Sequence, residues 1–157
     1  MAEPVSLKAV VETLESLGEE LFAFLNPHTG DLVILSAEDI RLVEDDAPAD
    51  ALPEWQQKVL AEAREVLASD EYLELPTSYD IHEYAIMEEF CSTIAKPQLR
   101  HALLDQIHGS GAFRRFKQAI HRYRIAEDWY RFRTAAVADI ASRWLDAHQI
   151  AYRRDVP

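Results

Sequence analysis

The sequence predicts a single α+β domain, 1–157, that is predominantly α-helical. Three observations lead to this fold class. Apolar residues recur at helical spacing through most of the chain, two β-prone runs near the N-terminus are joined by a turn with Pro and Gly, and 157 residues fit one domain. We expect an N-terminal helix and β-hairpin (1–44), an acidic, proline-containing linker (45–53) and a multi-helix body (54–152).

The N-terminal part is predicted from its spacing and its capping residues. A helix from Ser6 to Leu17 has an amphipathic pattern, and Ser6 suits its N-cap. Strands at 20–25 and 31–35 follow, joined by Asn-Pro-His-Thr-Gly, which is typical of a hairpin turn. Both faces of this hairpin carry apolar side chains, so we expect both to be covered. A short helix then begins after Ser36, with Asp39 at the capping-box position.

The rest of the chain is predicted to be helical. The run 44–53 holds two prolines and four acidic residues, which interrupts regular structure and favours a linker. After it, a helical apolar stripe begins at Trp55, and a short extended piece ends at Pro76. Four further helices are expected near 80–95, 97–108, 112–124 and 126–147.

Several motifs occur together and in order along the chain. They are Leu-Asn-Pro-His-Thr-Gly-Asp at 25–31, a Tyr-Asp-Ile-His-Glu-Tyr run opening 79–90, Gly-Ser-Gly-Ala-Phe-Arg-Arg-Phe-Lys at 109–117 and Glu-Asp-Trp-Tyr-Arg-Phe-Arg at 127–133. With these motifs the chain resembles the bacterial uncharacterised protein family (UPF) 0158 over nearly its whole length. The resemblance implies no reaction, cofactor or catalytic residue, so each candidate site depends on the chemistry of its own residues.

Charge is divided unevenly along the chain. Residues 1–95 carry 22 acidic and 4 basic residues, residues 96–157 carry 6 acidic and 12 basic residues, and the net charge is −12. Either the two parts pair within one folded body, or each faces an oppositely charged partner, which for the acidic part is a basic protein. The negative total disfavours nucleic acid. The single Cys91, with no signal-peptide pattern and no long apolar run, predicts a cytoplasmic protein without a membrane segment.

The first candidate site is an anion-binding helix start at 109–117. Two glycines flank a serine at the beginning of a predicted helix, and cations follow in its first turns, where the helix dipole disfavours them. A bound anion would remove that conflict, and carboxylates of the acidic part are the structural alternative. The residues concerned are Gly109, Ser110, Gly111, Arg114, Arg115 and Lys117.

The second candidate is an ion pair. Arg133 falls on the apolar stripe of the last helix, and a buried arginine requires a carboxylate. Glu83 and Glu88 border the apolar face of the helix expected at 80–95, so either one could supply it. We interpret the pair as structural, because a catalytic carboxylate normally has further polar partners in one pocket.

A metal site is the third candidate. His101, Asp105 and His108 lie at i, i+4 and i+7, near enough on one helix to share an ion. They oppose the apolar stripe of that helix and are predicted to face water without a fourth ligand. We therefore expect no metal and no cofactor, and we expect Cys91 to be a core residue.

These observations favour a non-enzymatic cytosolic interaction or regulatory protein that binds an unknown protein partner. The alternative is a phosphate- or anion-binding protein that uses 109–117 for a phosphometabolite or an RNA end. An enzyme of unknown class comes third, because no catalytic constellation is recognisable in the sequence.

Overall fold

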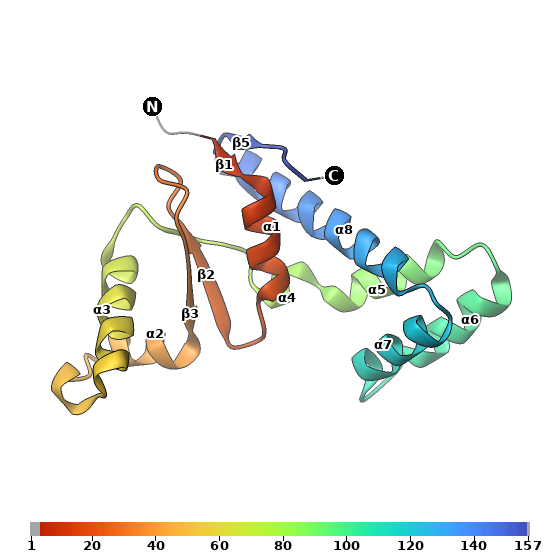
Figure 1. Ribbon diagram of the computed structural model, residues 1–157, viewed down its shortest axis with the longest axis horizontal. Helices are drawn as coiled ribbons and strands as arrows, with labels where there is room; N and C mark the ends of the chain where they lie inside the picture. The colour runs from red at the N-terminus through yellow and green to blue at the C-terminus, as the bar shows by residue number, and fades with distance from the viewer. Residues whose placement is uncertain (1–3, 157) are drawn as a thin grey trace. The chain divides into compact units, whose positions relative to one another are not determined.

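The computed structural model describes residues 4–156 and has an α+β fold that is predominantly helical, as the sequence predicts (Figure 1). The chain divides into two compact units. The first is formed by Met1–Asp80 with Ala141–Pro157, and the second by Ile81–Ile140. The boundaries therefore lie at 80/81 and 140/141, and the acidic segment 45–53 lies inside the first unit.

Two chain segments that are distant in sequence meet at the start of the first unit. Strand β1 (Val5–Ser6) pairs in parallel with β5 (Tyr152–Arg153), and α1 (Leu7–Ser16) follows β1 directly. Ser6 is the N-cap of α1, as predicted, and its Oγ accepts a hydrogen bond from Ala9 N at 3.1 Å. The α1 residues Leu7, Val10, Val11 and Leu14 are all buried.

The Asp155 carboxylate joins the last residues to the start of α1. It accepts a hydrogen bond from Ser6 Oγ at 2.6 Å and from Lys8 N at 2.8 Å. These two bonds lower the pKa of the Asp155 carboxyl, the Ser6 bond more than the Lys8 bond. Stability from a lowered carboxyl pKa is present above the ordinary pKa and is lost as the pH falls through the folded-state value. Asp155 thus supports α1 at neutral pH.

The hairpin of the first unit belongs to a three-stranded antiparallel sheet. Its order is β3 (Leu32–Ser36), β2 (Leu21–Leu25) and β4 (Leu73–Glu74). The turn between β2 and β3 is organised by buried Asn26, whose Oδ1 accepts hydrogen bonds from His28 N and Thr29 N. The predicted hairpin is therefore correct, and a short third strand completes the sheet.

The sequence predicts that both faces of this sheet are covered, but only one is covered throughout, because Ile34, which pairs with Ala23 on the other face, is 44% exposed. Phe22 pairs with Leu35 and Phe24 with Val33. Their face packs on α2 (Ala37–Glu44) and α3 (Glu54–Ala68) in a core around Phe24, Leu35, Ala63 and Val66. On the other face, Ala23 and Leu25 are also buried.

Two details near α2 and α3 bear on the sequence predictions. The capping box is present, since Ser36 Oγ accepts from Asp39 N and the Asp39 carboxylate accepts from Ser36 N. In the acidic segment a 3-10 turn, η1 (Ala49–Ala51), precedes α3. The predicted apolar stripe is wrong at Trp55, which is 68% exposed. Trp55 lies in the first turn of α3, and the buried residues of that helix begin only at Leu60.

The second unit is helical. Its helices include α5 (Glu83–Ser92), α6 (Pro97–Gln106), α7 (Ala112–Arg122) and most of α8 (Ala126–Ala147). The helix expected at 80–95 is interrupted, because His82 has a φ of +54° and separates α4 (Ser78–Ile81) from α5. Such a left-handed residue cannot continue an α-helix. No helix within 4–156 is long and apolar enough to cross a membrane.

Aromatic rings form the centre of the second unit. Trp129 of α8 contacts Phe116 of α7 and Phe90 of α5, with ring centroids 4.9 and 5.4 Å apart. The ring centroids of Phe132 and Phe90 are also 5.4 Å apart. Phe116, Trp129 and Phe132 lie between basic residues in the sequence. Their packing on Phe90 shows that these rings are core side chains and not a surface on which nucleic-acid bases stack.

Candidate functional site

The predicted helix start at 109–117 is present, with Gly111 as the N-cap of α7. No side chain caps this helix, so Ser110 does not take that role. The guanidinium of Arg115 turns back to the loop instead. Its Nε donates to Gln106 O at 3.0 Å, its Nη1 to Ser110 O at 2.6 Å, and its Nη2 to His108 O. Arg115 therefore closes the connection between α6 and α7 by binding backbone carbonyls.

The other cations of this motif remain on the surface. Arg114 and Lys117 are both exposed on α7, while Phe116 between them is buried. The predicted set is thus divided: Arg115 holds the loop, and Arg114 and Lys117 are accessible to a ligand. Anion binding at 109–117 stays a prediction.

We predict that Gly111→Ala destabilises the protein more than Gly109→Ala. Both glycines have positive φ, +80° and +76°, which costs roughly 1 kcal/mol for alanine. At Gly111 an added Cβ would also lie 3.2 Å from Arg115 Nη1, whereas at Gly109 it would meet open space. We expect losses of about 2 and about 1 kcal/mol in the free energy of unfolding, measured with urea. Equal losses would mean that the Arg115 guanidinium adjusts to the added Cβ without loss of stabilising contacts.

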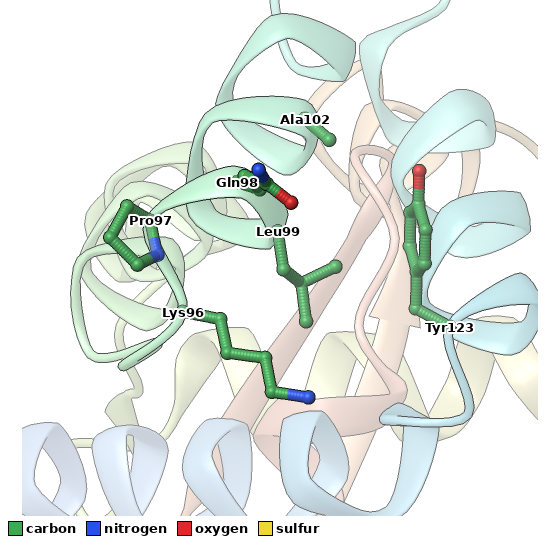
Figure 2. A pocket seen from close by; sticks show the side chains of 6 residues that line it. All are labelled: Lys96, Pro97, Gln98, Leu99, Ala102 and Tyr123. Atoms are coloured by element: carbon green, nitrogen blue, oxygen red, sulfur yellow. The ribbon is translucent and has the colours of Figure 1, made fainter.

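A groove lies between the beginning of α6 and the end of α7 (Figure 2). It has a volume of about 810 Å³, within the usual range for a ligand pocket. Figure 2 shows the Tyr123 ring across from Leu99, with the Lys96 side chain running beneath Leu99. The residues that line the groove are Lys96, Pro97, Gln98, Leu99, Ala102 and Tyr123. Most of these side chains are apolar, so the groove suits an apolar group with one negative charge beside it.

The sequence explains why this end of α6 is positive. Pro97 occupies the first helical turn, where its missing N–H is no loss, and its fixed φ starts the helix. Lys96 is the N-cap residue, and no acidic side chain lies in the first turn. The partial positive charge of the helix N-terminus and the charge of the Lys96 ammonium therefore both lie at the start of α6, and no carboxylate in its first turn neutralises them.

The groove belongs to the most basic part of the chain. Residues 96–124 contain seven Lys or Arg and a single acidic residue, Asp105. Arg114, Lys117 and Arg122 are exposed on α7, as is Phe113. Sequence reasoning missed the groove because its walls come from two helices. The signal that could have found it is Lys96-Pro97 at a helix start without a following acid.

Arg133 of α8 and Glu83 of α5 form an ion pair inside the second unit. Arg133 Nε lies 2.7 Å from Glu83 Oε1, and Arg133 Nη2 donates to Glu83 Oε2 at 3.3 Å. The two side chains are 19% and 35% exposed. Of the two predicted carboxylates, Glu83 is thus placed at Arg133, and Glu88 is exposed on α5. This geometry fits a structural link between two helices.

The metal candidates are not brought together. His101, Asp105 and His108 are all exposed. Helix α6 ends at Gln106, so His108 does not lie on the same helix as His101 and Asp105, as the predicted metal site requires. Among residues 4–156, no three His, Cys, Asp or Glu side chains are grouped as metal ligands. Cys91 is fully buried, and this burial raises the pKa of its thiol to about 11. At neutral pH Cys91 is therefore a protonated core side chain.

Comparison with known proteins assigns the chain to a family. The model of the uncharacterised protein family UPF0158 covers residues 12–156. No curated protein and no solved structure matches the chain. Function must therefore be inferred from the surfaces described above.

Proposed function

We propose, from the premise that the chain belongs to the uncharacterised protein family UPF0158, that it is a non-enzymatic cytoplasmic interaction protein. Its α6–α7 groove takes an acidic segment of a protein partner. The observation that carries this proposal is the combination of an apolar groove of about 810 Å³ with Lys96 at an uncapped helix start. An apolar side chain of the partner lies against Leu99 and Tyr123, and a carboxylate beside it faces Lys96.

The two contacts contribute differently. Burial of a leucine-sized side chain is worth roughly 2 kcal/mol. A carboxylate paired with an exposed lysine contributes roughly 0.2–1 kcal/mol. Affinity therefore depends mainly on the apolar contact. The surrounding cations, with seven bases to one acid over 96–124, select an acidic partner and speed its approach.

The test uses a fluorescein-labelled peptide with a central leucine flanked by glutamates. Its binding to the protein is measured by fluorescence anisotropy. We expect Tyr123→Ala to weaken binding about tenfold and Lys96→Ala about fivefold. Lys58→Ala is the matched control, because Lys58 is an exposed lysine on α3 in the first unit, and it should leave the affinity unchanged. Affinity should also fall between about 50 and about 300 mM salt.

Two outcomes would contradict this proposal. If Lys58→Ala weakens binding as much as Lys96→Ala, the affinity depends only on the total charge of the protein and not on a contact with Lys96. If inorganic phosphate displaces the peptide and Arg114→Ala abolishes binding while Tyr123→Ala does not, the ligand is a small anion held at 109–117. The second outcome would support the anion-binding alternative instead.

A further inference from the structure

The backbone of strand β3 has hydrogen-bonding groups that face away from its sheet. β3 is an edge strand, since the strand order is β3-β2-β4. Asn26 N donates to Asp31 O at 2.9 Å, and Ala37 N donates to Glu20 O at 2.8 Å. In an antiparallel pair, hydrogen-bonded and non-bonded positions alternate along the strand. Asp31 and Ala37 are bonded positions, so the odd-numbered residues between them face β2.

The even-numbered residues of β3 therefore direct their N–H and C=O outward. These residues are Leu32, Ile34 and Ser36. On the other side of β2, Leu75 N donates to Ala23 O at 2.9 Å, which agrees with this alternation. Ser36 N is used by the Asp39 carboxylate in the capping box. Within residues 4–156, no hydrogen bond reaches the outward groups of Leu32 and Ile34.

The side chains of β3 do not protect this edge. Natural proteins shield edge strands with charged residues, proline or a bulge. β3 reads Leu-Val-Ile-Leu-Ser and has no charge and no proline. Ile34 is 44% exposed, so the strand presents a large apolar side chain to solvent. The edge thus combines free backbone groups with an uncovered apolar side chain.

We propose that the β3 edge binds an extended basic segment of a partner protein by strand addition. Backbone hydrogen bonds form at Leu32 and Ile34, and an apolar residue of the partner covers the Ile34 side chain. The charge of the first unit identifies the partner: this unit contains 21 acidic and 7 basic residues, a net charge of −14. Asp31 precedes β3 directly, and Glu38 and Asp39 follow it within three residues.

The same charge argues against a second copy of the chain as the occupant. Pairing two β3 edges would bring together two units of net charge −14, and this repulsion opposes association. Lysine or arginine residues on both sides of a short apolar run would instead meet Asp31 at one end of β3 and Glu38 at the other. This surface lies in the first unit and does not involve the α6–α7 groove.

The test uses an acetylated and amidated peptide, Lys-Lys-Val-Thr-Val-Lys-Lys, titrated into the full chain and followed by hydrogen exchange detected by NMR. Binding should slow exchange at the Leu32 and Ile34 amides and leave the Val33 amide, already bonded to β2, little changed. Ile34→Lys should weaken binding at least about tenfold through charge repulsion and loss of apolar contact. Ile34→Val is the matched control and should keep the affinity within about twofold.

Several results would overturn the proposal. Protection that does not alternate along β3, or equal affinities for Ile34→Lys and Ile34→Val, would exclude strand addition. Absence of binding by this peptide at low salt would exclude the basic occupant. A dimer in analytical ultracentrifugation that Ile34→Lys converts to a monomer would assign the edge to a second copy. Tyr123→Ala should leave binding of this peptide unchanged. The strand-addition proposal at β3 and the proposed binding of an acidic segment in the α6–α7 groove can therefore fail independently of each other.

Discussion

Trp129→Ala is expected to lower the free energy of unfolding of the second unit by about 4 kcal/mol. Trp129 is 3% exposed, and its ring contacts Phe116 and Phe90 edge to face. Truncation would leave a cavity among α5, α7 and α8, and it would remove two ring contacts worth roughly 0.5–1.5 kcal/mol each. Urea unfolding followed by circular dichroism measures the loss without depending on tryptophan fluorescence.

The neighbouring Tyr130 provides the control for this prediction. It is also an aromatic residue of α8, but it is 50% exposed. Tyr130→Ala has the same helical context and should therefore lower the free energy of unfolding by less than about 1 kcal/mol. If the two substitutions cost the same, Trp129 would not be a core residue, and the aromatic cluster could not be what joins the three helices.

Arg133→Met should lower the free energy of unfolding by about 2 kcal/mol. Removing one partner of a fully buried ion pair typically costs roughly 3–5 kcal/mol, because the other charge is left without compensation. Glu83 is 35% exposed, so water screens part of that penalty. The double variant Arg133→Met with Glu83→Gln should lose less than the sum of the two single variants, since it removes both charges together.

A second pair on α8 shows how much of this effect depends on burial. Arg131 Nη2 lies 3.0 Å from Asp128 Oδ1, and these side chains are 76% and 62% exposed. Arg131→Met should cost less than about 0.5 kcal/mol. If Arg133→Met costs no more than Arg131→Met, or if the double-variant cycle shows simple addition, Arg133 and Glu83 do not link α5 to α8.

Much of the helical structure could be predicted because its signals are local. Pro97 marks the start of α6, Gly111 the start of α7, and the Ser36 capping box the start of α2. Each signal acts within one or two turns of the residue that carries it. The interruption at His82 has no such signal, because a left-handed histidine is held by its surroundings.

The pairing of β1 with β5 could not be predicted. Each strand has two residues, too few for a visible alternation, and Val5 and Tyr152 are far apart in sequence. Asp155 reads as a surface acid near the end of the chain, yet its two hydrogen bonds reach Ser6 and Lys8. Nothing local distinguishes an acid with such a distant partner from a solvated one.

The candidate site at 109–117 was predicted only as far as its local geometry. Helix spacing identified the start of α7 and the cations in its first turns. It could not identify the acceptors of Arg115, which are carbonyls at Gln106, His108 and Ser110. A guanidinium has five donors, and both backbone carbonyls and anions satisfy them. Which of the two it contacts depends on how the loop after α6 turns.

The pairing of β1 with β5 has a consequence for synthesis of the protein in the cell. The first unit is discontinuous, with the second unit inserted between Asp80 and Ala141. At roughly 5–20 residues per second, the ribosome needs about 7–30 s to proceed from Ser6 to Asp155. During that interval the start of α1 lacks the carboxylate that accepts from Ser6 and Lys8. The second unit is one continuous segment, Ile81–Ile140, so all of its aromatic core residues are synthesised before β5 of the first unit. It can therefore fold before the first unit is complete.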